Sequence, residues 1–256
     1  MSFQFCDSMI HQYRADGYAV FRQILPPSLI SDLRKASARV PEFARKKRGP
    51  QAQRLQPISS HDIDLKPFKD YAELPPLVDA VARLLTPRHK IGTEFDTTGI
   101  LIEPAERPGW TNWHRDITEE SNVPDLEEFV RIKSDPLWFN QINCPLYEDN
   151  CTWYVPGSYL RENFSEEVEA ANAPRPPEDA SYQELERAGI QYAQSMPRAV
   201  RLSMDAGDFA IYHPNAWHIG NYLPDRKRVT IHDFAPTPEL LDWYRRWNEK
   251  RASDNK

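Results

Sequence analysis

His114 and Asp116 are separated by one residue, a spacing that could place two metal ligands side by side. Residues i and i+2 of a β-strand point to the same face, so the imidazole and the carboxylate would converge and Arg115 would point away. A His-x-Asp triplet alone is weak evidence, because such triplets also occur by chance. A metal site needs a third ligand from another strand that faces the same cavity.

His218 can provide that third ligand. It follows a strand expected at residues 209–213 and a short turn at 214–217, so it could lie at the end of that strand. Two other histidines, His213 and His232, compete for the same position. Two histidines and one carboxylate on one side of an ion leave the opposite positions open, the arrangement associated with non-haem iron(II) oxygenases.

Arg228 begins another expected strand, ten residues after His218. A guanidinium group inside a cavity suits a carboxylate, which it can bind through two parallel hydrogen bonds. The adjacent Arg226 and Lys227 favour the alternative of an exposed cationic hairpin, and the spacing does not decide between the two. If Arg228 points inward, Thr230 shares its face and could bond the same ligand.

The elements that must position these residues are helices first and short strands afterwards. Apolar spacing predicts helices near residues 8–16, 29–36 and 77–85, and Ser28 is the expected N-cap of the second helix. A strand is expected at 18–21, and residues 45–70 are polar and are expected to be irregular. Strands are expected at 91–103, 110–116, 138–146, 151–155, 199–202, 209–213 and 228–234. This order, without alternation of strand and helix, favours a mainly β fold, an antiparallel double sheet or barrel braced by helices.

Composition is that of a globular protein, with 40% apolar and 27% charged residues in 256. The net charge of −6 and the absence of a long basic run argue against nucleic acid as a partner. We expect no membrane partner either, because no apolar stretch reaches the roughly 20 residues that span a bilayer. The three cysteines form no disulfide or zinc pattern and the first residues resemble no leader, so we expect a cytoplasmic location.

Four segments together resemble one protein family. They are Tyr13–Val20 with Ile24-Leu25-Pro26, Trp113-His114-Arg115-Asp116, Glu148-Asp149-Asn150 with Trp153–Ser158, and Gly207–Pro214 followed by His218 and Arg228. The chain resembles the phytanoyl-CoA dioxygenase (PhyH-type) branch of the iron(II)/2-oxoglutarate oxygenases. The resemblance implies a double-stranded β-helix (jelly-roll, cupin-like) core, with iron(II), 2-oxoglutarate and O2 as the reacting partners of a small-molecule substrate.

The resemblance also implies roles for single residues. His114, Asp116 and His218 would bind iron and act in catalysis, and Arg228 would pair with the distal carboxylate of 2-oxoglutarate. The further residues expected at the co-substrate site are Asn140, Gln141, Thr111 and Thr230. Related halogenases have a small residue at the position of Asp116, so the carboxylate favours hydroxylation with release of succinate and CO2, while desaturation, cyclisation and C–P cleavage stay open.

Two features depart from the family pattern. The loop from His218 to the arginine is about one residue shorter than usual, which leaves Arg226 as an alternative to Arg228. The small residue that often follows the distal histidine is Gly220, which offers no hydroxyl to the co-substrate.

One domain over residues 1–256 is expected, with N-terminal helices at 1–90, the jelly-roll core at about 91–235 and a C-terminal helix at 238–250. The charged segment at about 160–196 is long for a plain connection and is interpreted as an insertion or a lid. A monomer or homodimer is expected. The alternatives are a non-catalytic jelly-roll binding protein and a cupin-like metalloenzyme that does not use 2-oxoglutarate.

Overall fold

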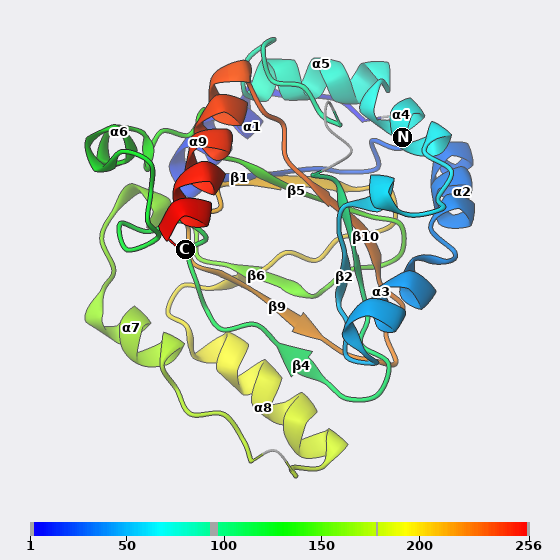
Figure 1. Ribbon diagram of the computed structural model, residues 1–256, viewed down its shortest axis with the longest axis vertical. Helices are drawn as coiled ribbons and strands as arrows, with labels where there is room; N and C mark the ends of the chain where they lie inside the picture. Colours follow the sequence, from blue (N-terminus) through cyan, green and yellow to red (C-terminus); the bar gives the residue numbers. More distant parts are fainter. Residues whose placement is uncertain (1–2, 93–96, 178, 255–256) are drawn as a thin grey trace.

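The computed structural model describes residues 3–92, 97–177 and 179–254, and it consists of two antiparallel sheets with helices around them (Figure 1). The helices of the described residues are α1 (Asp7–Asp16), α2 (Pro27–Ala36), α3 (Val40–Arg48), α4 (Lys66–Ala72), α5 (Pro75–Leu84), α6 (Leu126–Ile132), α7 (Ser165–Ala171), α8 (Tyr182–Ser195) and α9 (Pro238–Asp254), with short 3-10 turns at Ile58–Ser60 and Ser158–Leu160.

The larger sheet has the strand order β1-β8-β5-β10-β3-β2. Its strands are β1 (Tyr18–Phe21), β8 (Phe209–Tyr212), β5 (Gln141–Pro145), β10 (Val229–Asp233), β3 (Gly99–Ile102) and β2 (Arg54–Leu55). The smaller sheet has the order β4-β9-β6-β7, with β4 (Gly109–Trp110), β9 (His218–Tyr222), β6 (Thr152–Tyr154) and β7 (Val200–Arg201).

Alternation along the strands of the larger sheet separates an apolar face from a polar one. Apolar side chains on one face join those of α2, α4 and α5 in the main core; among them are Ile100, Ile142, Phe209 and Ile231. The residues between them, such as Asn143 and His232, therefore face the smaller sheet. The side-chain amide of Asn143 donates to the Thr152 hydroxyl at 3.0 Å, which joins the two sheets.

Helix α8 covers the outer face of the smaller sheet (Figure 1). Its residues Tyr192 and Ala193, with Met196 directly after the helix, pack in one cluster with Trp110 and Trp153. The Tyr192 hydroxyl accepts a hydrogen bond from the Trp113 amide at 3.0 Å. This part of the 160–196 segment is therefore a packing layer on the small sheet, and Trp110 and Trp113 serve that packing.

Several expected elements differ from the structure. Residues 45–70 are not irregular, because they contain the end of α3, strand β2 and part of α4. The strands expected at 91–103 and 110–116 are reduced to β3 and β4, and residues 93–96 lie outside the described part. Strand β9 was not expected. Helices hold 39% of the described residues and strands 16%, so the fold is a mixture of helices and antiparallel sheets and not mainly β.

The second helix begins two residues earlier than predicted. Pro26 is its N-cap and Pro27 its first residue, without a side-chain cap from Ser28. In the described part of the chain, no helix is both long and apolar enough to cross a membrane.

Candidate metal centre

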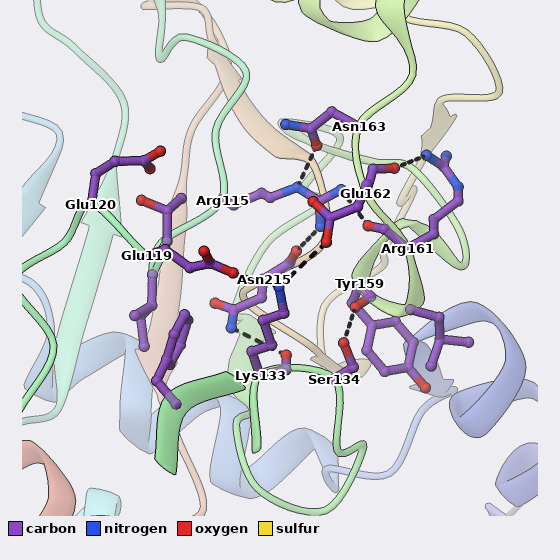
Figure 2. A pocket seen from close by; sticks show the side chains of 14 residues that line it. Arg115, Glu119, Glu120, Lys133, Ser134, Tyr159, Arg161, Glu162, Asn163 and Asn215 are labelled. Carbon is purple, nitrogen blue, oxygen red and sulfur yellow. Dashed lines mark hydrogen bonds and ion pairs between the residues drawn. The ribbon is translucent and has the colours of Figure 1, made fainter. Parts of the chain in front are cut away.

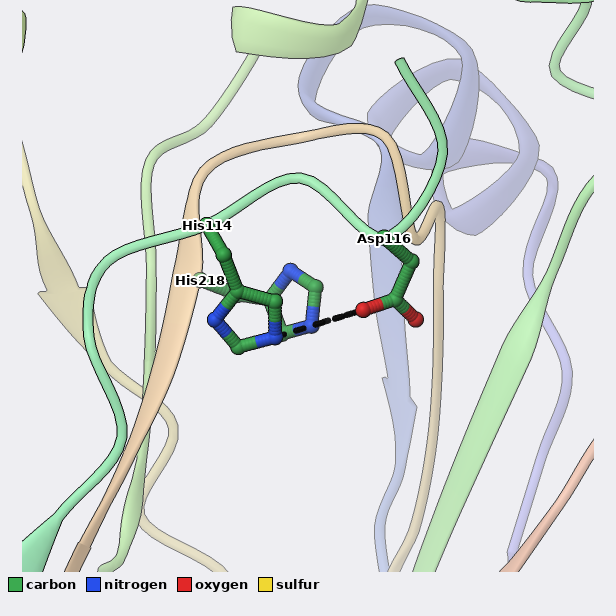
Figure 3. Close-up of side chains that lie close together, drawn as sticks. All are labelled: His114, Asp116 and His218. Carbon is green, nitrogen blue, oxygen red and sulfur yellow. Dashed lines mark ion pairs between the residues drawn. The ribbon is translucent and has the colours of Figure 1, made fainter. Parts of the chain in front are cut away.

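His114, Asp116 and His218 lie together at one end of the space between the sheets (Figure 3). One possible ligand atom from each lies within 4.8 Å of the others. Oδ1 of Asp116 is 3.2 Å from Nε2 of His114 and 3.5 Å from Nε2 of His218. Among the described residues, no other group of three acidic, histidine or cysteine side chains has this geometry.

Backbone carbonyls fix both imidazole rings from behind. Nδ1 of His114 lies 2.6 Å from the carbonyl oxygen of Asn112, and Nδ1 of His218 lies 2.9 Å from that of Ala216. A carbonyl only accepts, so each Nδ1 carries the proton and each neutral ring keeps its Nε2 lone pair for a ligand. This donor set of two imidazole nitrogens and one carboxylate oxygen fits a divalent transition metal.

The charges of His218 and Asp116 agree with that fit. Burial opposes the change, but the hydrogen bond and the charge of Asp116 raise the pKa of His114, so a metal would displace a proton from this ring. Burial, together with the charge of His114, lowers the pKa of His218 to about 4, so this imidazole is neutral at neutral pH. Burial alone would raise the pKa of Asp116, but the His218 and His114 rings outweigh it and hold that pKa at about 2. A neutral imidazole and an ionised carboxylate are the forms that bind a metal.

The ligands do not converge through a continuous strand, as the spacing suggested. Strand β4 ends at Trp110, and His114 is held by an isolated antiparallel bridge to His218 in β9, with N–O distances of 3.2 and 3.1 Å. The amide of Asp116 donates to the carbonyl of Pro214 at 3.0 Å. The metal motif is thus aligned on the start of β9, which also explains why His218 is close to it.

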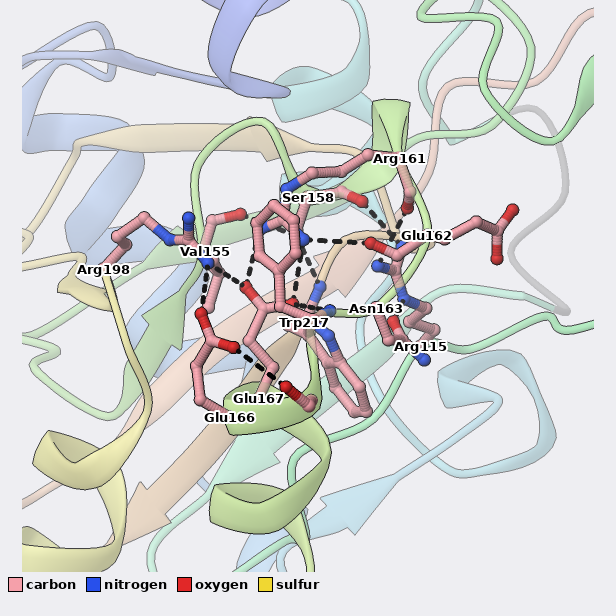
Figure 4. Close-up of polar contacts among 12 residues, drawn as sticks. Arg115, Val155, Ser158, Arg161, Glu162, Asn163, Glu166, Glu167, Arg198 and Trp217 are labelled. Carbon is pink, nitrogen blue, oxygen red and sulfur yellow. Dashed lines mark hydrogen bonds and ion pairs between the residues drawn. The ribbon is translucent and has the colours of Figure 1, made fainter.

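Arg115 does not line the cavity of the three residues and contacts the segment at 158–163 instead, as expected for a side chain that points away from them (Figure 4). Its guanidinium donates to the carbonyls of Ser158 at 2.8 Å and Asn215 at 2.5 Å, to that of Arg161 at 3.2 Å, and to the Asn163 side chain at 2.8 Å. It also borders a surface pocket of about 380 Å³ on this outer side, lined by Glu119, Glu162, Lys133 and other polar residues (Figure 2). Arg115 therefore serves as an anchor for the motif.

A cavity of about 550 Å³ extends from the three residues between the two sheets. Its walls include Gln141, which donates to the other carboxylate oxygen of Asp116, and Thr111, whose hydroxyl accepts from the amide of Gly220 at 3.0 Å. The Oε1 atom of Gln141 is buried without a hydrogen-bond partner in the described structure. The cavity therefore brings Thr111 and Gln141 together with the three candidate ligands.

Arg228 also lines this cavity and is 2% exposed. Its Nε donates to Oδ2 of Asp149 at 2.8 Å, and its Nη1 is buried without a hydrogen-bond partner among the described residues. Arg226, the alternative, is exposed and lines a different pocket. Only Arg228 of the two faces the space that the three candidate ligands share.

Asn140 and Thr230 do not line the cavity. The side-chain amide of Asn140 is bonded to the backbone of Ala235 at both ends, at 2.9 and 2.7 Å. The Thr230 hydroxyl shares the face of Arg228 but donates to the same carboxylate, Asp149. Their expected contacts with a co-substrate are therefore not supported by the geometry.

The other two candidates for the third ligand, His213 and His232, are not part of the three-residue group. His213 is buried away from the cavity, stacked on Tyr159 with ring centroids 4.5 Å apart, and burial lowers its pKa to about 3. His232 lines the cavity, but it bonds the Asn143 side chain at 2.8 Å and is not in the three-residue group. His218 is the one that lies beside His114 and Asp116.

Three residues in and behind the cavity were not singled out from the sequence. Asp149 lies in the recognised acidic turn, but only the fold shows that it pairs with Arg228. Tyr222 places its hydroxyl in the space that a side chain at Gly220 would occupy, and the guanidinium of Arg228 lies over its ring at 4.8 Å. The hydroxyl of Tyr222 therefore lies directly beside Gly220. The third, Arg54, lies in a region that the sequence analysis took as irregular.

A model of the phytanoyl-CoA dioxygenase (PhyH) family matches residues 13–221, more than half of the chain. The chain belongs to the phytanoyl-CoA dioxygenase family. The resemblance inferred from the four segments is thereby confirmed. The match contains His114, Asp116 and His218, whereas Arg228 and α9 lie beyond its end. A search of curated proteins gave no match.

Solved structures with related folds are distant in sequence. EvdMO1 is 16% identical with a TM-score of 0.59 and covers 90% of this PhyH-family chain, which spans about half (49%) of EvdMO1. HygX from Streptomyces hygroscopicus, solved with nickel and 2-oxoglutarate bound, is 14% identical with a TM-score of 0.57. The matched region covers 92% of this chain and 88% of HygX. The non-heme alpha-ketoglutarate-dependent carbocyclase SnoK is 14% identical with a TM-score of 0.54. The matched region covers 91% of this chain and 85% of SnoK. At these identities, the similarities show a shared fold and no more.

Proposed function

We propose that this PhyH-family protein is a mononuclear iron(II) enzyme that uses 2-oxoglutarate and O2 to oxidise a small molecule. The observation that carries the proposal is the shared cavity, which has the His-Asp-His group and the buried, incompletely bonded guanidinium of Arg228 in its walls. A metal site alone would suit many proteins. The added cation is suited to a carboxylate at a fixed place in the same cavity.

The iron ligands in this proposal are His114, Asp116 and His218, and each has a defined task. The two imidazoles present Nε2, since Nδ1 is occupied by backbone carbonyls. Gln141 holds the second oxygen of Asp116, which leaves Oδ1 for the metal. When bound, iron(II) would supply the activation of O2, coupled to decarboxylation of 2-oxoglutarate to succinate and CO2.

Arg228 would bind the distal carboxylate of 2-oxoglutarate. Asp149 fixes its Nε, and the backbone amide of Arg228 donates to Glu103 at 2.8 Å, so the side chain and its strand are oriented before any ligand binds. Nη1 then remains for the carboxylate. Tyr222 would add a hydroxyl at the place where family members often carry a small hydroxylated residue.

Hydroxylation of an unactivated C–H bond is the proposed outcome, because a carboxylate stands at 116 where related halogenases have a small residue. We further propose that the two sheets form the double-stranded β-helix (jelly roll) of this family, in one domain over residues 1–256. Strands β1 and β2 from the N-terminal part complete the larger sheet, which supports a single unit. A cytoplasmic monomer or homodimer remains our expectation.

The test is anaerobic reconstitution of the purified chain with iron(II) and 2-oxoglutarate. A weak visible charge-transfer band should form, and succinate should be released in air when candidate substrates are added. Arg228→Ala should raise the 2-oxoglutarate requirement steeply, whereas Arg226→Ala, its exposed neighbour, should not.

The outcome separates the alternatives. A non-catalytic binding protein would give neither the band nor succinate. A cupin-like metalloenzyme would bind iron without any response to 2-oxoglutarate, and Arg228→Ala would then have no effect. An effect of Arg226→Ala alone would reverse the assignment within the basic group.

A further inference from the structure

A second, larger cavity of about 810 Å³ adjoins the metal cavity. Arg54, Gln141 and His232 line both spaces and therefore mark their junction. The second cavity lies between the end of β10 and one face of α9, with Leu241 and Tyr244 among its walls. Its volume suits a small organic molecule.

Arg54 is directed into these cavities by the sheet. It pairs with Leu101 of β3, which pairs with Thr230 of β10, so the three share the face that looks toward the smaller sheet. The next residue, Leu55, lies on the opposite face in the main core. The register thus fixes the direction of the Arg54 side chain, although β2 is short.

Arg54 also lacks a partner. Within the described part of the chain its partly buried guanidinium makes no hydrogen bond or ion pair, unlike Arg228, which pairs with Asp149, and Arg245, which pairs with Asp242 and Glu249. Arg48, at the end of α3, is a second cation on the wall of the metal cavity that has no such partner among these residues. A cation that lines a concave site and is not paired with a carboxylate is suited to an incoming anion.

Filling the co-substrate site does not remove this excess of positive charge. Iron(II) and 2-oxoglutarate would cancel each other's charge, and Arg228 and Asp149 cancel each other. Asp116 then offsets only one of the two remaining guanidinium groups, Arg48 and Arg54. Asp233 in the second cavity offsets only part of the remaining charge at neutral pH, because burial raises its pKa to about 7.

We propose that the substrate carries an anionic oxygen group, such as a carboxylate or a phosphate, and that Arg54 binds it at the junction of the two cavities. The less polar part of the substrate would lie in the second cavity, against Leu241, Tyr244 and Phe234. This inference rests on the proposed function for the identity of the reaction, but the binding itself is measurable without turnover.

Two fluorescent probes with the same ring skeleton test the charge requirement. 8-Anilinonaphthalene-1-sulfonate carries a sulfonate, and N-phenyl-1-naphthylamine is the same skeleton without it. Both are titrated into the full chain loaded with nickel(II) and 2-oxoglutarate. Arg54→Gln should weaken the sulfonate probe roughly ten- to a hundredfold, the range of a charge-assisted hydrogen bond, and leave the neutral probe within about twofold. Arg39→Gln, a matched change outside both cavities, should alter neither.

A second variant tests the position of the apolar part. Leu241→Trp fills the second cavity and should weaken both probes. Octanoate and octyl phosphate, added as competitors, separate a carboxylate from a phosphate preference, and at least one should displace the sulfonate probe from the unmodified chain. Thermal melting checks that each variant is folded.

Three results would overturn the inference: equal affinity of the sulfonate probe for Arg54→Gln and the unmodified chain, no effect of Leu241→Trp, or displacement by neither competitor. Loss of 2-oxoglutarate binding in Arg54→Gln as severe as in Arg228→Ala would assign Arg54 to the co-substrate site instead. If the unmodified chain bound no metal or 2-oxoglutarate, the proposed function would fail, and the probe comparison, repeated without them, would still decide the role of Arg54.

Discussion

Replacement of Asp149 by asparagine tests the electrostatic basis of the co-substrate site. Asp149 and Arg228 are 1% and 2% exposed, and Nε lies 2.8 Å from Oδ2. Asp149 also accepts hydrogen bonds from the amide of Cys151 at 2.8 Å and from the Thr230 hydroxyl. Asparagine preserves the size of the side chain and can keep an acceptor, so the main loss is the negative charge beside a buried guanidinium.

The expected cost is large because Arg228 is left uncompensated. With charge centres about 4 Å apart and an effective dielectric constant of about 20, the lost attraction is about 4 kcal/mol, within the roughly 3–5 kcal/mol typical of breaking a buried pair. We expect Asp149→Asn to lower the free energy of unfolding by this amount in urea denaturation followed by circular dichroism. Adding Arg228→Met should restore most of it, because the unpaired charge is then removed.

The pH dependence has a defined sign. Burial alone would raise the pKa of Asp149, but the charge of Arg228 and the hydrogen bonds to this carboxylate hold its pKa below the usual range. The stabilisation is therefore fully present above the unfolded-state pKa of about 3.9 and is lost as pH falls through the lower folded-state pKa. The difference in free energy of unfolding between the unmodified chain and Asp149→Asn should be constant from pH 8 to 5 and should become smaller below about pH 4. Asp242→Asn, in an exposed pair, is the control and should have little effect. A difference under about 1 kcal/mol for Asp149→Asn at pH 7 would refute the reasoning.

Three further predictions concern single residues. Burial raises the pKa of Asp233 to about 7, so the folded state keeps a proton that the unfolded chain loses near pH 3.9. The free energy of unfolding should therefore fall by roughly 2–4 kcal/mol between pH 4 and 7. Denaturation curves measured across this range should show that Asp233→Asn abolishes this pH dependence. Tyr222→Phe should weaken 2-oxoglutarate binding about three- to tenfold by calorimetry, whereas Tyr182→Phe on the surface should not; equal affinities would remove Tyr222 from the site. Arg115→Lys cannot serve four acceptors, so metal affinity should fall about tenfold or more in a nickel(II) titration, and an unchanged affinity would show that the outer clamp does not position the ligands.

The residues nearest to the proposed iron site were the most accessible to sequence reasoning. His114 and Asp116 could be paired because the side chains at i and i+2 converge in extended chain, and this held although the segment is only bridged to β9 and is not a strand of its own. Arg228 was proposed from its charge in a strand-like context and from the family resemblance, with Arg226 as the alternative. The elements around them were predicted less well, since β2 and β9 are short and carry weak periodic patterns.

The sequence by itself determined the family and the candidate ligand pair His114 and Asp116, and it narrowed the cation for a carboxylate to Arg228 or Arg226, because these depend on residue type and on spacing over a few positions. Only the tertiary structure decided that His218, and not His213 or His232, lies beside the pair, that Asp149 fixes Arg228, and that Arg54 enters the cavity. Each of those facts depends on which distant strands pair and in which register. Register is set by the packing of the whole sheet against its helices, and a one-residue shift would turn each side chain to the opposite face.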